Sequence, residues 1–221
     1  MAATISSAGS GVSTTENLSV ATGATVTAVA GDWLVSIVAA SNDGTGGASS
    51  FSNCTDSQTN TWIIRAHINY DPGAAGAGAT LAICTCAVTN AITNGTVTAN
   101  FSANTSQKAI QVYLVDSAAG ETVTFIAADT TGSTGGASPY TAAQVSVTSG
   151  DIIFGGAAIE TDDTISGDGD TINGSWSSIL TRLADGGADA STMSSCSQYK
   201  TTTGTGNQDW ACTSATGRDS A

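Results

Sequence analysis

The sequence predicts an all-β protein, and three observations lead to this prediction. Residues that build the solvent-facing side of helices are scarce: Lys and Arg together number five, and Glu occurs only at Glu16, Glu121 and Glu160. Thr, Val and Ile, which suit the pleated surface of a sheet, are plentiful. Short apolar runs alternate with Gly-, Asn- and Asp-rich turns along the chain, which is typical of a sandwich or a barrel.

One phrase of the sequence occurs twice and predicts two related halves. The segments Val26–Asp32 (VTAVAGD) and Val145–Asp151 (VSVTSGD) each join an alternating stretch to a Gly-Asp turn. They lead into the apolar runs Trp33–Ala40 and Ile152–Ile159. An acidic, Gly-rich loop and a tryptophan segment follow in both places.

The halves, about 17–120 and 121–221, are expected to form one sandwich domain spanning 17–221. A half with so few large apolar residues would leave a sheet face bare, whereas two halves can cover each other. Residues 1–16 are small and polar, and we interpret them as a flexible or partner-docked N-terminal arm. The Gly-rich stretch 132–136 is interpreted as a loop inside the sandwich.

Strands are expected wherever an apolar or alternating run lies between turn residues. In the first half these runs lie near 18–29, 33–40, 60–70, 80–88, 96–102 and 108–115. In the second half they lie near 121–127, 142–148, 151–159, 175–183, 192–200 and 207–214.

The alternation from Trp62 to Tyr70 predicts which side chains face the core. One face of this segment is apolar, so we expect it to be buried; its residues are Trp62, Ile64, Ala66, Ile68 and Tyr70. Arg65 and His67 fall on the other face and are expected to point outward.

The charge excludes several classes of partner. The net charge of −13 argues against binding a nucleic-acid backbone or an anionic membrane surface. No stretch approaches the roughly 20 apolar residues of a membrane-spanning helix. Residues 1–9 have neither the basic nor the apolar region of a secretory signal, so we expect synthesis in a cytoplasm without export by that route.

No catalytic constellation is present, and we expect no enzyme activity. His67 is the only histidine and lies in mid-strand without a nucleophile motif nearby. Most Asp residues occupy turns, where the carboxylate bonds the local backbone. A hydrolase that uses paired carboxylates, with Glu160 among them, is therefore the least favoured of the functions considered.

The five cysteines have no metal-binding spacing and are interpreted as small buried hydrophobic residues. A Cys196–Cys212 disulfide is the alternative, if these two residues lie on neighbouring strands. The cysteines are Cys54, Cys84, Cys86, Cys196 and Cys212.

The acidic loop of the second half supplies the candidate binding residues. Asp168, Asp170 and Asn173 resemble a calcium loop in composition, although no Glu closes the loop. A solvated loop without a cofactor is the preferred interpretation, and a bound divalent cation is the alternative. Trp176 and Trp210 have polar neighbours. Ordinary core or interface packing is the preferred interpretation, and a partner- or sugar-contacting surface is the alternative.

Three segments carry a family resemblance: Gly31–Val38, Asp56–Trp62 and Asn94–Thr98. Together they resemble the jelly-roll-like β-sandwich modules of tailed-phage virions, over about residues 20–115 and less clearly from 145 on. Among these modules, capsid decoration (cement) proteins fit best. The resemblance transfers no catalytic residue.

This resemblance implies a viral structural protein on the outer surface of the capsid. It implies binding to the major capsid protein, stabilisation of the shell, and a homo-oligomer, with a trimer favoured. The alternative is a carbohydrate- or host-surface-binding module of a tail fibre or a bacterial adhesin.

Overall fold

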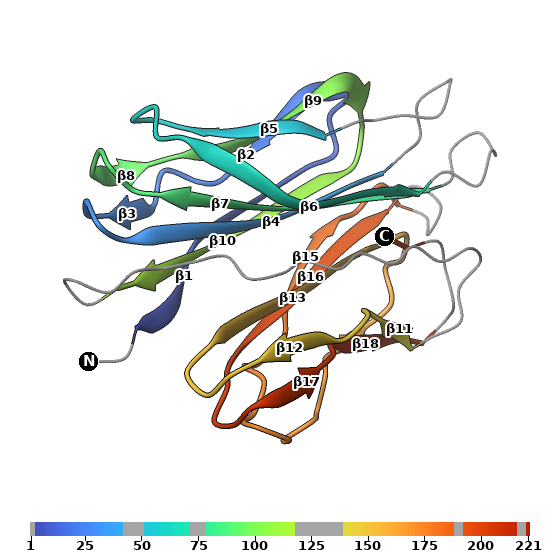
Figure 1. Cartoon of the computed structure of the whole chain (residues 1–221). Coiled ribbons are helices and arrows are strands. Elements are labelled where there is room, and N and C mark those ends of the chain that lie inside the picture. Colours follow the sequence, from blue (N-terminus) through green and yellow to red (C-terminus); the bar gives the residue numbers. More distant parts are fainter. Residues whose placement is uncertain (1–2, 42–50, 71–77, 118–138, 188–191, 216–219) are drawn as a thin grey trace.

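The computed structural model describes residues 3–41, 51–70, 78–117, 139–187, 192–215 and 220–221. In these residues it contains 18 β-strands and no helix, so the expected all-β class is confirmed (Figure 1). The strands expected at 121–127 and the loop at 132–136 lie outside the described residues.

The first ten strands occupy residues up to 116. They are β1 (Thr4–Ser13), β2 (Asn17–Ala21), β3 (Val26–Ala28), β4 (Trp33–Ser41), β5 (Phe51–Asp56), β6 (Trp62–Tyr70), β7 (Ala79–Ala87), β8 (Ile92–Gly95), β9 (Val97–Thr105) and β10 (Lys108–Asp116).

The remaining eight strands are mostly shorter. They are β11 (Tyr140–Thr141), β12 (Val145–Val147), β13 (Ile152–Ile159), β14 (Ile165–Ser166), β15 (Leu180–Ala184), β16 (Met193–Thr201), β17 (Gly206–Gln208) and β18 (Ala211–Ser214).

Antiparallel sheets are stacked in four layers, as Figure 1 shows from top to bottom. The outer layer β2-β9-β5, with the β3-β8 pair, covers the five-stranded sheet β1-β10-β4-β7-β6. The sheet β13-β16-β15 lies against the other face of that five-stranded sheet, and β11-β18-β14 with β12-β17 forms the last layer. Both inner sheets are therefore covered on both faces.

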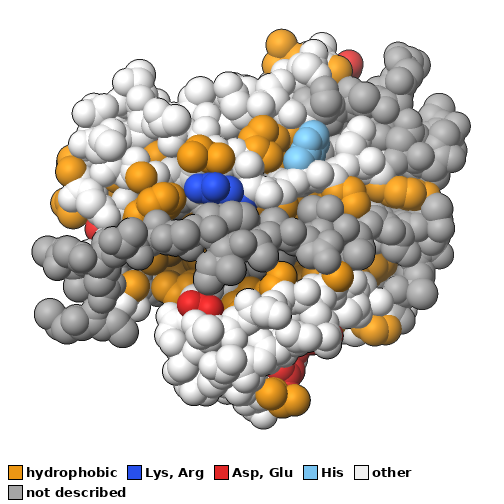
Figure 2. Space-filling view, viewed as in Figure 1, with side chains coloured by type: hydrophobic (Ala, Val, Ile, Leu, Met, Phe, Trp, Pro, Cys, Tyr) orange, Lys and Arg blue, Asp and Glu red, His pale blue; other side chains and the backbone are white. Residues whose placement is uncertain are grey.

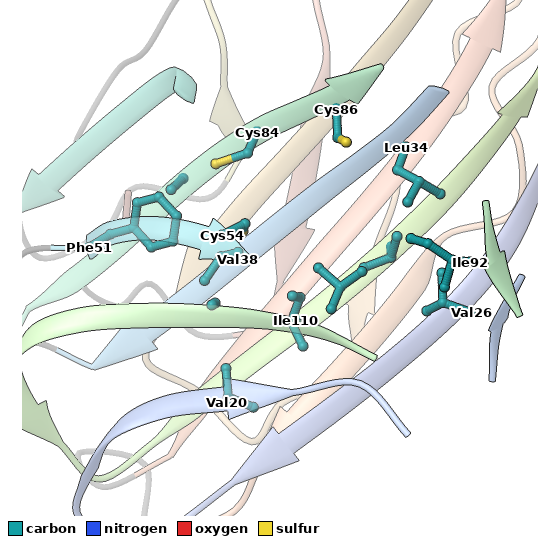
Figure 3. Close-up of a cluster of buried hydrophobic side chains, with 14 of the residues drawn as sticks. Val20, Val26, Leu34, Val38, Phe51, Cys54, Cys84, Cys86, Ile92 and Ile110 are labelled. Atoms are coloured by element: carbon teal, nitrogen blue, oxygen red, sulfur yellow. The ribbon is translucent and has the colours of Figure 1, made fainter. Parts of the chain in front are cut away.

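Three hydrophobic clusters lie between these layers. The first cluster has 18 buried residues between the first two layers, including Leu34, Ile110 and Phe51 (Figure 3). The second joins the two inner sheets and includes Ile37 and Tyr113. The third has eight buried residues, Trp176 and Trp210 among them, between the last two layers.

The two Gly-Asp turns have the same hydrogen bonds. Asp32 Oδ2 accepts from Val29 N at 2.8 Å, and Asp151 Oδ2 accepts from Thr148 N at 2.7 Å. Gly31 and Gly150 have φ of 104° and 96°, a conformation that favours glycine. Each turn therefore places a glycine where the backbone must reverse and uses the next carboxylate to fix the reversal.

Residues 4–13, assigned above to an arm, form strand β1 of the five-stranded sheet. β1 pairs antiparallel with β10 from Thr4–Asp116 to Ser13–Lys108. Small side chains allow this placement, because a Cβ on Gly11 would overlap the carbonyl oxygen of Ala21. A short polar segment can thus complete a sheet when backbone pairing supplies the interactions.

Strand β6 differs from its expected alternation. A β-bulge between Ile64 and Ala66 shifts the register, so the side chains before and after it face opposite layers. Trp62 consequently contacts the first cluster, whereas Ile68 and Tyr70 contact the second. The expectation of one buried face along the whole strand was wrong for this reason.

Other strand predictions differ mainly at their ends. The run 18–29 is divided into β2 and β3, and 175–183 becomes a strand only from Leu180. β5 and β8 were not predicted, because Asn, Ser and Thr in their sequences also suit turns.

Candidate functional site

The acidic loop of the second half is built from two successive Asx turns. Asp168 Oδ1 accepts from Asp170 N at 2.7 Å, and Asp170 Oδ1 accepts from Ile172 N at 2.8 Å. Asp168 Oδ2 also accepts from Ala211 N at 2.9 Å, which ties the loop to β18. Three of the four carboxylate oxygens therefore bond the backbone.

The fourth oxygen contacts a buried lysine. Lys200 Nζ lies 3.2 Å from Asp170 Oδ2, and it donates to Ile172 O at 2.6 Å and to Gln208 Oε1 at 2.8 Å. The ammonium also lies 5.3 Å from the centre of the Trp176 ring, within cation–π range. Lys200 is 1% exposed. Its ammonium group contacts Asp170, Ile172, Gln208 and Trp176, and these contacts join the acidic loop to the sheet.

This arrangement changes the acidity of Asp170. The backbone N–H of Ile172 lowers the pKa of Asp170, and Lys200 lowers the pKa further. Asp170 therefore stays ionised at neutral pH, and its contact with Lys200 helps to hold the loop.

In the described part of the chain, the metal candidates take part in hydrogen bonds within the protein. The carboxylate oxygens of Asp168 and Asp170 already bond backbone N–H groups and Lys200. The backbone carbonyl oxygen of Asn173 accepts from Thr203 N at 2.9 Å. Among the described residues, no three His, Cys, Asp or Glu side chains converge on a common point. A hard cation needs several convergent oxygens, so these residues fit a structural turn better than a metal site.

Both tryptophan candidates lie in the third cluster and not on the surface. Trp176 is 8% exposed and Trp210 is 4% exposed. Trp210 lies against Gly155 of β13, because a Cβ there would overlap the indole ring. Neither ring offers a face on which a sugar could stack.

The buried Gln198 was missed by sequence reasoning. Gln198 Oε1 accepts from Trp210 Nε1 at 2.9 Å and from Asp168 N at 2.7 Å. Gln198 Nε2 donates to Ser177 O at 2.7 Å. One side chain of β16 therefore fixes both the acidic loop and a core tryptophan, and a polar residue within the predicted strand 192–200 was the available signal.

Two other side chains with reactive groups are His67 and Cys86. His67 is exposed on β6, its ring centre lies 5.9 Å from that of Phe51, and burial of part of the imidazole lowers the His67 pKa. Burial, and to a smaller extent Asp56, raises the pKa of Cys86 to about 12. A thiol with such a pKa is a poor nucleophile at neutral pH.

An exposed hydrophobic surface lies on β6, the last strand of the five-stranded sheet. Ile63 and Ile64 are 46% and 42% exposed, beside the half-buried Arg65 and the exposed His67. Figure 2 shows hydrophobic, basic and histidine side chains together in the region where Figure 1 places β6. We call Ile63, Ile64, Arg65 and His67 the β6 surface.

Sequence reasoning did not find the β6 surface. The alternation placed Ile63 on the outward face with Arg65 and His67, but it predicted Ile64 to be buried. The bulge beside Arg65 and the place of β6 at the end of its sheet expose both isoleucines.

Comparisons with protein-family models, with curated proteins and with solved structures find no match for this chain. None of the described residues belongs to a helix of the length and hydrophobicity needed to cross a membrane.

Proposed function

We propose that this chain is a non-enzymatic structural protein of a virion that binds the outer surface of a capsid as a decoration protein. The observation that carries the proposal is the β6 surface. It combines two exposed isoleucines with the half-buried Arg65 and with His67, on a chain whose net charge is −13. Singly exposed apolar residues are common, but adjacent ones at a sheet edge are typical of contact surfaces.

The chemistry of the described residues supports binding without turnover. The carboxylates of the acidic loop bond the backbone and Lys200, and Trp176 and Trp210 are buried. Stacked antiparallel sheets with few charges also suit a protein that must hold a fixed shape while bound to a shell.

A segment of the major capsid protein with apolar side chains would cover Ile63 and Ile64. A trimer of this chain would present three such surfaces to a local threefold position of the shell.

Particle composition tests the proposal. Quantitative mass spectrometry of purified virions should find this chain at a fixed ratio to the major capsid protein, and added protein should co-sediment with undecorated heads. Absence from purified particles, with no binding to heads, would refute the capsid role.

A negative charge introduced on the β6 surface tests the proposed contact. Ile63→Glu should reduce co-sedimentation at least tenfold while leaving circular dichroism and the melting temperature near those of the parent protein. Ile172→Glu is the matched control, since Ile172 is 67% exposed and lies on the acidic loop away from β6. Equal loss of binding in both variants would show that β6 is not the contact.

We also propose that the sandwich consists of two related halves with a jelly-roll-like ancestry. Equivalent strand pairs support this relationship. β4-β7-β6 has the counterpart β13-β16-β15, β2-β9-β5 has β11-β18-β14, and β3-β8 has β12-β17. The register of the central pair is also equivalent, with Trp33 opposite Ala87 and Ile152 opposite Thr201, directly after each Gly-Asp turn.

A further inference from the structure

Two buried thiols lie in contact across the third hydrophobic cluster. The sulfur atoms of Cys196 on β16 and Cys212 on β18 are 3.6 Å apart. The two residues are 0% and 1% exposed. They belong to different layers, because β16 is the middle strand of an inner sheet and β18 is the middle strand of the last layer.

The geometry is close to that of a cystine. A disulfide has its sulfur atoms about 2.05 Å apart, so the two atoms need to approach by about 1.5 Å. Rotation of the two cysteine side chains and small shifts of β16 and β18 would supply such a movement. The other neighbour of Cys196 Sγ is the Ala157 carbonyl oxygen at 3.9 Å, which lies on the adjoining strand.

A covalent link between Cys196 and Cys212 would stabilise the part of the protein that has the smallest hydrophobic cluster. The third cluster contains eight buried residues against 18 in the first. The layer that it holds is made of short strands: β11 and β14 have two residues each, and β18 has four. Small apolar cores of this kind are those that covalent links stabilise in other proteins.

We propose that Cys196 and Cys212 form a disulfide that joins the last layer to the inner sheet when the chain folds in the presence of a small-molecule disulfide. The thiolate of one cysteine attacks the oxidant and forms a mixed disulfide, releasing one thiol. The thiolate of the other cysteine then displaces the second thiol. The two cysteines lose two protons and two electrons, and one oxidant disulfide becomes two thiols.

The timing of the reaction follows from burial. Contact with Cys212, together with burial, raises the pKa of Cys196 well above its ordinary value. Little thiolate is therefore present in the folded protein, and no reagent reaches the pair. Oxidation should occur while the chain folds and should be slow once folding is complete.

Peptide mapping tests the proposal directly. The protein is refolded from urea in reduced and oxidised glutathione, and free thiols are then alkylated in urea. Trypsin cleaves after Arg182, Lys200 and Arg218, so it places Cys196 in peptide 183–200 and Cys212 in peptide 201–218. The expected product is a link between these two peptides with a mass 2 Da below their sum. Alkylation of both cysteines at every glutathione ratio would refute the proposal.

Two variants and a melting curve complete the test. Cys86→Ser should leave the linked peptides unchanged, whereas Cys212→Ser should abolish them. The oxidised protein should melt roughly 6–12 °C above the reduced protein, as expected for closing a loop of about 15 residues in a chain of this size. If Cys212→Ser does not fold, Cys212→Ala replaces it, because a small apolar residue suits a buried site. Equal melting temperatures for the oxidised and reduced forms would refute the stabilising role.

Discussion

The hydroxyl groups of Tyr113 and Ser197 lie 2.7 Å apart where β10 meets β16. This hydrogen bond joins the two inner sheets and is buried. The Tyr113 ring also contacts Phe154 and Tyr199, with ring centres 5.4 Å and 5.7 Å away. One tyrosine thus supplies both an aromatic contact and a polar contact between strands that are 84 residues apart.

Replacing Tyr113 by Phe should lower the free energy of unfolding by about 1–2 kcal/mol, because Ser197 loses its buried partner. Urea unfolding followed by tryptophan fluorescence measures this change. The double variant Tyr113→Phe/Ser197→Ala should recover part of the loss, since no unpaired hydroxyl then remains. Strictly additive losses would show that the two hydroxyl groups do not interact.

The ionisation of Tyr113 should be displaced to high pH. Burial raises the Tyr113 pKa to about 12, above the unfolded value of about 10. The resulting stabilisation is fully present below pH 10 and is lost as the pH rises towards 12. Absorbance at 295 nm should show one tyrosine ionising late, and this phase should be missing in Tyr113→Phe. Ionisation of all tyrosines near pH 10 without unfolding would contradict the buried position.

Gly155→Ala should destabilise the protein by about 1–3 kcal/mol, because the added methyl group overlaps the Trp210 ring. Tryptophan fluorescence should also change, since the indole must move. Gly169→Ala is the control, because a Cβ at that position meets nothing within 4 Å. Similar losses in both variants would indicate a backbone effect in place of a steric one.

Asp170→Asn should reduce the dependence of stability on acid pH. The pKa of Asp170 is lowered in the folded protein, so its contribution is present above the unfolded pKa of about 3.9 and is lost as the pH falls through the folded value. The urea midpoints of parent and variant should therefore differ most at pH 7 and converge below pH 3. The exposed Asp116, replaced by Asn, serves as the control. A constant difference from pH 7 to pH 2 would exclude the ionised pair as the cause.

Gly31→Ala and Gly150→Ala should each cost about 1 kcal/mol or more, although a Cβ at either position meets nothing within 4 Å. The cost arises from the positive φ of both glycines. Thermal unfolding measures it, and Gly169→Ala is again the reference. If the two costs prove negligible, the turns do not require the left-handed conformation.

Sequence patterns were reliable where one local rule decided the outcome. The run from Trp33 became a strand of nine residues because no turn residue interrupts it, and each Gly-Asp pair became the expected turn. The prediction for β6 was wrong at Ile64, which is exposed, and in assuming one face for the whole strand, because a bulge depends on how β6 pairs with β7 and leaves no pattern in β6 itself. The sequence left Trp210 open between core and surface for a similar reason, since its burial depends on Gly155 and Gln198 of other strands.

The amino-acid order alone determined the all-β class, the main strands and the two glycine turns, because backbone sterics and side-chain periodicity act over a few residues. Only the folded chain decided that residues 4–13 complete a sheet, that the sheets form four layers, and that Ile64 faces solvent. These features depend on contacts between distant segments, whose free energies appear only when the layers pack against one another.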